Sequence, residues 1–440
     1  MRRVPPFAIT MISSEAFGLR NGVIHCEEVP LPAIAASVGT PVYIYSSASM
    51  RRQAERLQRA LGGLADPLIA YAVKANPNGA VLATFAALGL GADVVSGGEY
   101  RRARAAGIPP EKIVFAGVGK TAAEMALALE GGIYQFNLES LPEAELLSEV
   151  ACSMGRIAPV AFRVNPDVEA GSHAKISTGA AHNKFGIPIA DAPAACARVR
   201  ELPGLDLKGV AVHIGSQLTR LAPLERAFEK IGQLIGELRA AGHDIRTADL
   251  GGGLGLRYDP SEPDPPTPEE YGAMIARVVE GWGVRLIFEP GRLLVGEAGV
   301  LLTEVIRVKA GPLFPFVVLD AAMNDLLRPT LYDAWHGIDA VQPRGERIRA
   351  DIVGPVCETG DTFAVGREVD RVETGDLMIV RTAGAYGATM ASTYNSRPLT
   401  PEVMVNGDAW AVVRQRRDVE AMIAEENMPA WLVSSDKDPT

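Results

Sequence analysis

A lysine stands at the end of a short apolar run, in the segment YAVKAN at 71–76. The run at 67–73 is too short and too rich in β-forming residues for a helix, so it predicts a buried strand. A lysine is rarely buried unless it is paired or neutralised for chemistry. An amine removed from water loses its proton more easily and can condense with an aldehyde. Lys74 is therefore a candidate nucleophile, against the alternative of a lysine that reaches solvent from a strand end.

Other residues that could do chemistry also follow apolar runs, in HIGSQ at 213–217, GGGLG at 251–255 and EPGR at 289–292. A run of glycines lets backbone amides approach a phosphate, although such a run is also a common flexible turn. An amine, a phosphate cradle, a flat ring (His213) and a carboxylate (Glu289) together describe a pyridoxal phosphate site. His213 would stack on the pyridine ring, and Glu289 would keep its nitrogen protonated. The simpler alternatives are a core histidine and a surface ion pair between Glu289 and Arg292.

The elements that must position these residues alternate between short apolar runs and longer amphipathic ones. The expected strands lie at 68–74, 92–96, 112–116, 134–138, 159–164, 207–213, 246–250 and 284–288. The expected helices include 80–88, 99–106, 122–130, 143–154 and 224–241, several of which end in glycine. This rhythm predicts a closed (β/α)₈ barrel, a TIM-like fold, with an open doubly wound sheet as the alternative. In a barrel, active sites lie at the C-terminal ends of the strands, where the residues above fall.

The rhythm stops after Arg292. Short β-like runs broken by Gly, Pro and Asp follow at 301–308, 316–319, 350–353 and 377–381, and they predict an all-β C-terminal domain. We therefore expect an N-terminal segment at 1–40 that joins the β domain, a barrel at 41–298 and the β domain at 299–440. Residues 259–268, with five prolines and three acidic residues, predict an exposed loop to which we assign no role.

Composition excludes several classes of function. The net charge of −10 over 440 residues, without a basic cluster, argues against nucleic acid or anionic membrane as a partner. No apolar run reaches the ~18 residues of a membrane span, and the N-terminus leads into no signal-like apolar core. The four cysteines lack both the CxxC pattern and metal-ligand spacing, so we expect no metal and a reducing, cytoplasmic location.

The chain resembles the barrel-type (fold type III) pyridoxal phosphate-dependent decarboxylases, and among them the diaminopimelate decarboxylase family. The resemblance covers nearly the whole chain. Besides the motifs above, it rests on SGGE at 96–99, RVNPDVEAGSHAKISTG at 163–179, NKFGI at 183–187, MNDLLRPTLYDAWH at 323–336, CETGD at 357–361, AGAYG at 383–387 and YNSRP at 394–398. Any one of these motifs is weak, whereas the ordered set is specific.

The resemblance implies a role for each matching residue. Residues implied to hold the cofactor are Lys74, His213, Ser216, Gly252, Gly253, Glu289, Pro290, Gly291, Arg292 and Tyr386. Residues implied to bind the substrate are Arg292, Arg328, Tyr332, Glu358 and Tyr386. Arginine matches a carboxylate bidentately and glutamate pairs an ammonium, which suits the distal end of meso-diaminopimelate. Cys357 is implied to donate a proton after carbon dioxide leaves, against the alternative of an inert buried thiol.

The implied activity is decarboxylation of meso-2,6-diaminopimelate to L-lysine, the last step of lysine biosynthesis. In this family the CETGD loop reaches the active site of the other subunit, which implies a homodimer with shared active sites. The alternatives are a related decarboxylase of ornithine, arginine or carboxynorspermidine, and a non-catalytic pyridoxal phosphate-binding protein. The segment at 176–179, together with Arg292 and Arg328, favours a substrate with a distal carboxylate. The presence of both Lys74 and Cys357 argues against a pseudoenzyme.

Overall fold

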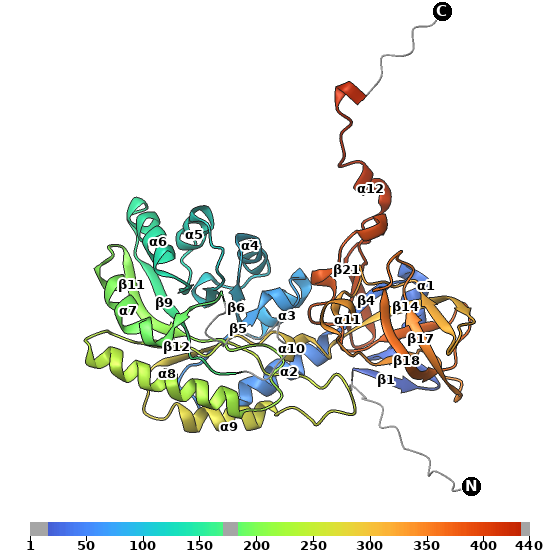
Figure 1. Cartoon of the computed structure of the whole chain (residues 1–440), viewed down its shortest axis with the longest axis horizontal. Helices are drawn as coiled ribbons and strands as arrows, with labels where there is room; N and C mark the ends of the chain where they lie inside the picture. Colours follow the sequence, from blue (N-terminus) through green and yellow to red (C-terminus); the bar gives the residue numbers. More distant parts are fainter. Residues whose placement is uncertain (1–15, 170–183, 433–440) are drawn as a thin grey trace, which may run out of the picture.

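The computed structural model describes residues 16–169 and 184–432. They form two parts that lie side by side, a barrel covered by helices and a smaller domain of strands (Figure 1). Within those two ranges, every helix is too short or too polar to cross a lipid bilayer. The chain leaves the smaller domain through an arm that carries helix α12 (Val419–Ile423).

Eight parallel strands of the described residues close into a barrel, because the last strand pairs with the first. They are β5 (Leu68–Ala72), β6 (Gly91–Val94), β7 (Ile113–Phe115), β8 (Gln135–Leu138), β9 (Ala158–Asn165), β11 (Leu205–Ala211), β12 (Thr247–Asp249) and β13 (Arg285–Phe288), with the short β10 (Ile187–Pro188) beside β9. Each barrel strand overlaps one predicted from the sequence. The closed ring confirms the (β/α)₈ prediction and excludes the open sheet.

Helices surround this ring and pack on the outer faces of the strands (Figure 1). They are α2 (Ser47–Ala60), α3 (Gly79–Ala87), α4 (Gly97–Ala105), α5 (Ala122–Glu130), α6 (Leu141–Ser153), α7 (Ala192–Glu201), α8 (Ala222–Ala240) and α9 (Pro268–Val278). Polar side chains cap several of them; Thr121 and Glu124 form a capping box at the start of α5. The residues at 259–266, which come before α9, form the loop that we predicted.

The smaller domain is built on a mixed sheet. Its strands are β4 (Val42–Ser46), β14 (Gly299–Lys309), β15 (Phe316–Leu319), β16 (Ile338–Ala340), β17 (Arg347–Val353), β18 (Thr362–Asp370), β19 (Leu377–Val380), β20 (Glu402–Asn406) and β21 (Ala409–Arg414). The long strand β14 pairs with β4, β15 and β19. One short helix, α11 (Arg328–Tyr332), lies between β15 and β16 and faces the barrel mouth. The all-β C-terminal domain is confirmed.

The N-terminal segment packs against this smaller domain. Strands β1 (Phe17–Arg20), β2 (Val23–Cys26) and β3 (Val29–Pro30) form a separate sheet, followed by α1 (Leu31–Val38). Phe17 and Ile24 share one apolar cluster with Val300 of β14.

The boundary that we expected between residues 40 and 41 is wrong by one strand. We expected residues 41–46 in the barrel, which we placed at 41–298. Strand β4 instead pairs with β14 and β20 in the smaller domain, where all five of its residues are buried. The barrel part of the chain therefore starts with α2 at Ser47.

Candidate active site

Lys74 lies at the C-terminal end of β5, in a short 3₁₀ turn (Val73–Ala75). All five residues of β5 are buried, which fixes the turn at the barrel mouth. Lys74 Nζ donates a hydrogen bond to Oδ2 of Asp93, on the neighbouring strand, over 2.6 Å. The other oxygen of this buried carboxylate, Oδ1, has no hydrogen-bond partner among the described residues. The amine is thus held by an acid at the opening of the barrel.

The charge state of Lys74 differs from our expectation. Burial lowers the pKa of Lys74, but the carboxylates of Asp93 and Glu289 outweigh burial, so the pKa lies above its ordinary value. The sequence-based expectation of a lowered pKa was wrong, because it could not show that two acids from other strands face this amine. Lys74 is therefore an ammonium that must give up a proton before it can act as a nucleophile.

A cavity of about 440 Å³ opens beside Lys74. Its walls come from the C-terminal ends of the barrel strands and from the smaller domain. The residues of our predicted site that line it are Lys74, His213, Ser216, Glu289, Arg292, Arg328, Tyr332 and Tyr386. Two links join the domains here: Tyr386 N donates to Ala75 O over 2.8 Å, and Asn76 Nδ2 donates to Gly384 O over 3.1 Å. The fold thus brings together residues that are more than 300 positions apart.

Buried acids surround Glu289 on the barrel side of the cavity. Burial, together with the nearby Asp249 and Asp93, raises the pKa of Glu289 well above its ordinary value. Burial also raises the pKa of Asp249 to about 6, and the two carboxyl groups are hydrogen-bonded to each other. Asn137 Nδ2 donates to Asp249 Oδ2 over 2.8 Å. Because like charges this close cannot all be ionised, Glu289 and Asp249 share a proton.

Sequence reasoning missed Asp93, Asn137 and Asp249. Each lies within or directly at the end of a buried barrel strand, at a position where an apolar residue is the usual choice. A carboxylate inside an apolar run was the signal that could have found Asp93 and Asp249.

The glycine run packs against the backbone so closely that side chains do not fit. A Cβ at Gly252 would lie 2.2 Å from Glu289 O, and one at Gly253 would lie 2.5 Å from Gly215 O. Gly251 and Gly253 also have positive φ angles, which favour glycine. With Gly291, Pro290 and Ser216, the run lines a smaller cavity of about 50 Å³ next to the main one. The result is a narrow recess walled by backbone.

His213 connects this recess to the main cavity. Its Nδ1 accepts a hydrogen bond from Gly252 N over 3.2 Å. Burial, Arg163 and Lys74 together lower the pKa of His213 well below its ordinary value. The ring is therefore neutral, and it carries no charge that would repel a pyridine ring whose nitrogen is protonated.

Two buried arginines line the main cavity, with Arg292 5% and Arg328 6% exposed. Arg292 Nη1 donates to Tyr258 Oη over 2.7 Å, and Nη2 donates to Ser216 Oγ over 3.2 Å. Arg292 Nε has no hydrogen-bond partner among the described residues. Within that part of the chain, neither guanidinium forms an ion pair with a carboxylate.

The surroundings of Arg328 fix its orientation. Its Nε donates to Nε2 of His336 over 3.4 Å, while Nδ1 of His336 lies 2.8 Å from Arg381 O. Burial and the nearby Arg328 lower the pKa of His336 to about 3, so this imidazole is neutral. Its Nδ1 therefore donates to the carbonyl and its Nε2 accepts from Arg328. Two adjacent cations without a counter-ion are costly unless a ligand brings negative charge.

Cys357 and Glu358 lie outside this cavity. Both are exposed on a loop of the smaller domain, and Cys357 N donates to Asn395 Oδ1 over 3.1 Å. Glu358 interacts with the hydroxyl of Tyr394. Part of the motif at 163–179, including the segment at 176–179, lies outside the described residues.

These features fit pyridoxal phosphate. The glycine recess offers backbone amides to a phosphate, and the orphaned Arg292 Nε and Asp93 Oδ1 offer buried polar atoms to a ligand. Neutral His213 can lie against a pyridine ring, and the acid pair around Glu289 can meet its nitrogen. The fold and the site define a barrel-type pyridoxal phosphate enzyme.

Comparison with known proteins narrows the class of enzyme to one family. Residues 47–296 match the family described as pyridoxal-dependent decarboxylase, pyridoxal binding domain. The diaminopimelate decarboxylase of Zymomonas mobilis is 57% identical over 418 residues, which cover 94% of this chain and 99% of that protein. That of Pseudomonas fluorescens is 48% identical over 416 residues, 94% of this chain and 99% of the other. The chain therefore belongs to the diaminopimelate decarboxylase family.

A solved structure agrees with this assignment. The crystal structure of diaminopimelate decarboxylase from M. jannaschii in complex with L-lysine has a TM-score of 0.92 to this chain at 35% identity. The match covers 96% of this chain and all of that one. The limit of the family match at residue 47 coincides with the start of α2, where the barrel part begins.

Proposed function

We propose that this protein decarboxylates meso-diaminopimelate to L-lysine and carbon dioxide. The observation that carries the proposal is a pair of buried arginines that face the same cavity as Lys74 and form no ion pair with a carboxylate of the described residues. A substrate with a distal carboxylate pairs with these arginines, whereas ornithine or arginine brings no distal carboxylate and leaves Arg328 unpaired. Diaminopimelate has such a carboxylate. The relatives of this chain at 57% and 48% identity are named diaminopimelate decarboxylase.

The proposed roles in cofactor binding follow from the geometry. Bound pyridoxal phosphate supplies an aromatic ring that accepts the electron pair released when the substrate carboxylate leaves. Lys74 would bind it covalently, and the Asp93 carboxylate would accept the proton that Lys74 must lose. His213 lies against its ring, and Glu289 with Asp249 holds a proton for the ring nitrogen. The recess binds its phosphate through the residues Gly252, Gly253, Pro290, Gly291, Ser216, Arg292 and Tyr386.

The proposed roles in substrate binding and proton transfer involve two chains. Arg292, Arg328, Tyr332 and Tyr386 bind the distal carboxylate within one cavity. Cys357 donates the proton that replaces carbon dioxide, and Glu358 pairs the distal ammonium. Because both residues are exposed on their own chain, the proposal places them in the cavity of the second subunit of a homodimer. The four free cysteines fit the cytoplasmic location that we also propose.

A substrate comparison tests this function. Purified protein with pyridoxal phosphate is incubated separately with meso-diaminopimelate, ornithine, lysine and arginine, and carbon dioxide release is measured. Release from meso-diaminopimelate in clear excess over the others is expected. A preference for ornithine or arginine would instead support a decarboxylase of another basic amino acid.

Lys74 is expected to be the residue that carries the cofactor. Borohydride reduction of the loaded protein, followed by peptide mass mapping, should place the pyridoxyl group on Lys74, because this amine faces the cavity from the barrel mouth. Lys120 provides an internal control, since it is buried but fully engaged by Glu143 and two backbone carbonyls. A pyridoxyl group on any lysine other than Lys74 would contradict the assignment.

The glycine recess is expected to control cofactor affinity. In Gly252→Ala the new Cβ would lie 2.2 Å from Glu289 O, so the loop must move. Relieving such overpacking costs about 1–3 kcal/mol, and ~1.4 kcal/mol is a factor of ten in affinity. We expect the Kd for pyridoxal phosphate, measured by absorbance titration, to rise about tenfold. Gly236→Ala, in α8 where a Cβ meets no atom within 4 Å, should leave the Kd unchanged. Equal Kd values in both variants would place the phosphate elsewhere.

A further inference from the structure

Residues 354–361, here called the Cys357 loop, are held by the carboxylate of Asp361. Asp361 Oδ2 accepts from Val356 N and Oδ1 accepts from Met323 N, both over 2.7 Å. The backbone closes the same loop, since Gly354 N donates to Asp361 O and Asp361 N donates to Glu358 O, both over 3.0 Å. Asp361 is 3% exposed, while Cys357 and Glu358 are exposed. A buried carboxylate thus fixes a loop whose functional side chains point outward.

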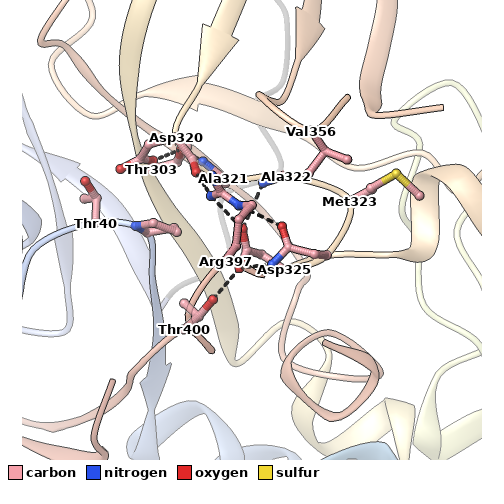
Figure 2. Close-up of polar contacts among 12 residues, drawn as sticks. Thr40, Thr303, Asp320, Ala321, Ala322, Met323, Asp325, Val356, Arg397 and Thr400 are labelled. Atoms are coloured by element: carbon pink, nitrogen blue, oxygen red, sulfur yellow. Dashed lines mark hydrogen bonds and ion pairs between the residues drawn. The ribbon is translucent and has the colours of Figure 1, made fainter. Parts of the chain in front are cut away.

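The second anchor of Asp361, Met323, belongs to a segment that is itself held rigidly. Arg397 Nε donates to Asn324 Oδ1 over 2.9 Å, and Arg397 pairs with Asp325 at 3.5 Å. Asp325 also accepts from Thr400 Oγ1 over 2.7 Å and from Ala322 N over 2.9 Å. Figure 2 shows Arg397 lying between Asp320 and Asp325, with Met323 and Val356 beside this network. The amide that Asp361 accepts from therefore has one fixed position.

This segment leads directly into α11, which carries Arg328 and Tyr332. Thr330 Oγ1, on the same helix, donates to Gly360 O of the Cys357 loop over 2.7 Å. The loop is therefore tied at two points to the frame that places the cavity arginine. One tie joins the side chain of Asp361 in the loop to the backbone of Met323, and the other joins the side chain of Thr330 to the loop backbone. Neither tie uses Cys357 or Glu358.

Gly354 provides independent support for the importance of the Asp361 carboxylate. A Cβ at residue 354 would lie 2.3 Å from Asp361 Oδ2 and 2.4 Å from Oδ1. The space that a side chain at 354 would need is filled by this carboxylate. The two residues are thus matched in shape: the absence of a side chain at one position admits the carboxylate of the other.

We propose that Asp361 is a positioning residue, which fixes the Cys357 loop on the frame of α11 so that Cys357 and Glu358 are presented in one geometry. The inference rests on the proposed function, in which these two side chains serve the cavity of the second subunit. Misplacing a reacting group by about 1 Å can cost on the order of 100-fold in rate. Asp361 touches neither cofactor nor substrate, so its effect passes through the loop.

Asp361→Asn tests the role directly. An amide keeps the size of the side chain but turns one acceptor into a donor that faces a backbone N–H. We expect kcat to fall by about 10- to 100-fold and KM to rise, because the displaced loop carries both Cys357 and Glu358, while cofactor loading stays unchanged. Asp351→Asn is the matched control, because Asp351 also accepts a backbone amide, that of Gly366, over 2.6 Å. Its kcat should stay within about twofold of wild type. Equal kcat values in the two variants would overturn the positioning role.

Gly354→Ala tests the same contact from the other side. Its Cβ should displace the Asp361 carboxylate and lower kcat to a similar degree. If both changes act through one contact, the double variant should be no slower than the slower single variant. A double variant whose loss in kcat is the product of the two single losses would show that Asp361 and Gly354 act separately, against the proposal.

Mixed dimers separate this inference from the proposed function. Refolding Asp361→Asn with Lys74→Ala should restore activity to about a quarter of wild type, because the Lys74→Ala chain supplies an intact loop to the intact lysine of its partner. Refolding Asp361→Asn with Cys357→Ala should restore no activity, since the Cys357 loop of both chains is then impaired. If the Cys357→Ala and Lys74→Ala pair recovers activity but the Asp361→Asn and Lys74→Ala pair does not, the inference is wrong. Failure of both pairs would overturn the shared site instead, and the kcat of Asp361→Asn against Asp351→Asn would still decide the positioning role.

Discussion

Replacing Arg328 by methionine is expected to lower kcat/KM for meso-diaminopimelate by about 30-fold to several thousand-fold. Truncating one partner of a buried charged pair costs about 2–5 kcal/mol, and each ~1.4 kcal/mol is a factor of ten. Arg328 is 6% exposed and lines the cavity, so a carboxylate bound there loses a contact that water cannot replace. Methionine preserves much of the volume, which limits the effect to charge and hydrogen bonding.

The change should leave cofactor loading intact, because in the described part of the chain Arg328 is hydrogen-bonded to His336 and does not line the glycine recess, while Lys74 is hydrogen-bonded to Asp93. Steady-state kinetics together with the cofactor absorbance spectrum therefore separate substrate binding from loading. Arg344→Met is the matched control: Arg344 is an exposed arginine of the same domain that pairs with Asp376. Its kinetics should stay within about twofold of wild type, since exposed ion pairs contribute little. Unchanged kcat/KM in Arg328→Met would show that the distal carboxylate is bound elsewhere.

The barrel could be predicted from sequence because each of its strands is a short apolar run punctuated by glycine or proline. In a parallel sheet covered by helices, strands are buried on both faces, and this leaves a clear composition signal. The meeting of Lys74, His213 and Glu289 at one cavity could be predicted from their places at strand ends, because a barrel puts all those ends at one mouth.

The parts that could not be predicted depend on closure of the fold. Tyr258, which accepts a hydrogen bond from Arg292, comes from a loop of the barrel and packs edge-on against His336 of the smaller domain. The raised pKa of Lys74 arises from Asp93 and Glu289, which are far apart in sequence and meet only when β13 closes onto β5. Strand β4 was assigned to the wrong domain because its pattern suits either sheet, and only pairing with β14 and β20 decides between them.

Because Cys357 is exposed on its own chain, we also expect activity to return when two inactive variants form mixed dimers. If Lys74 and Cys357 of one chain serve different active sites, Lys74→Ala and Cys357→Ala homodimers should both be nearly inactive. In a mixed dimer one site collects both changes and the other collects neither. Unfolding and refolding the two variants together in equal amounts should make about half of the dimers mixed, each with one intact site of two. Activity should recover to about a quarter of wild type.

The controls decide whether recovery comes from a shared site. Lys74→Ala refolded with the double variant Lys74→Ala, Cys357→Ala cannot form an intact site in any dimer and should stay inactive. Cys152→Ala, at another exposed cysteine, should keep full activity, which shows that loss of a surface thiol is harmless in itself. Native mass spectrometry confirms that subunits have exchanged. If mixed dimers are present and no activity returns, Cys357 works within its own chain or not at all. A monomeric active enzyme is also contrary to the proposal, because Cys357 and Glu358 do not line the cavity of the chain that carries them.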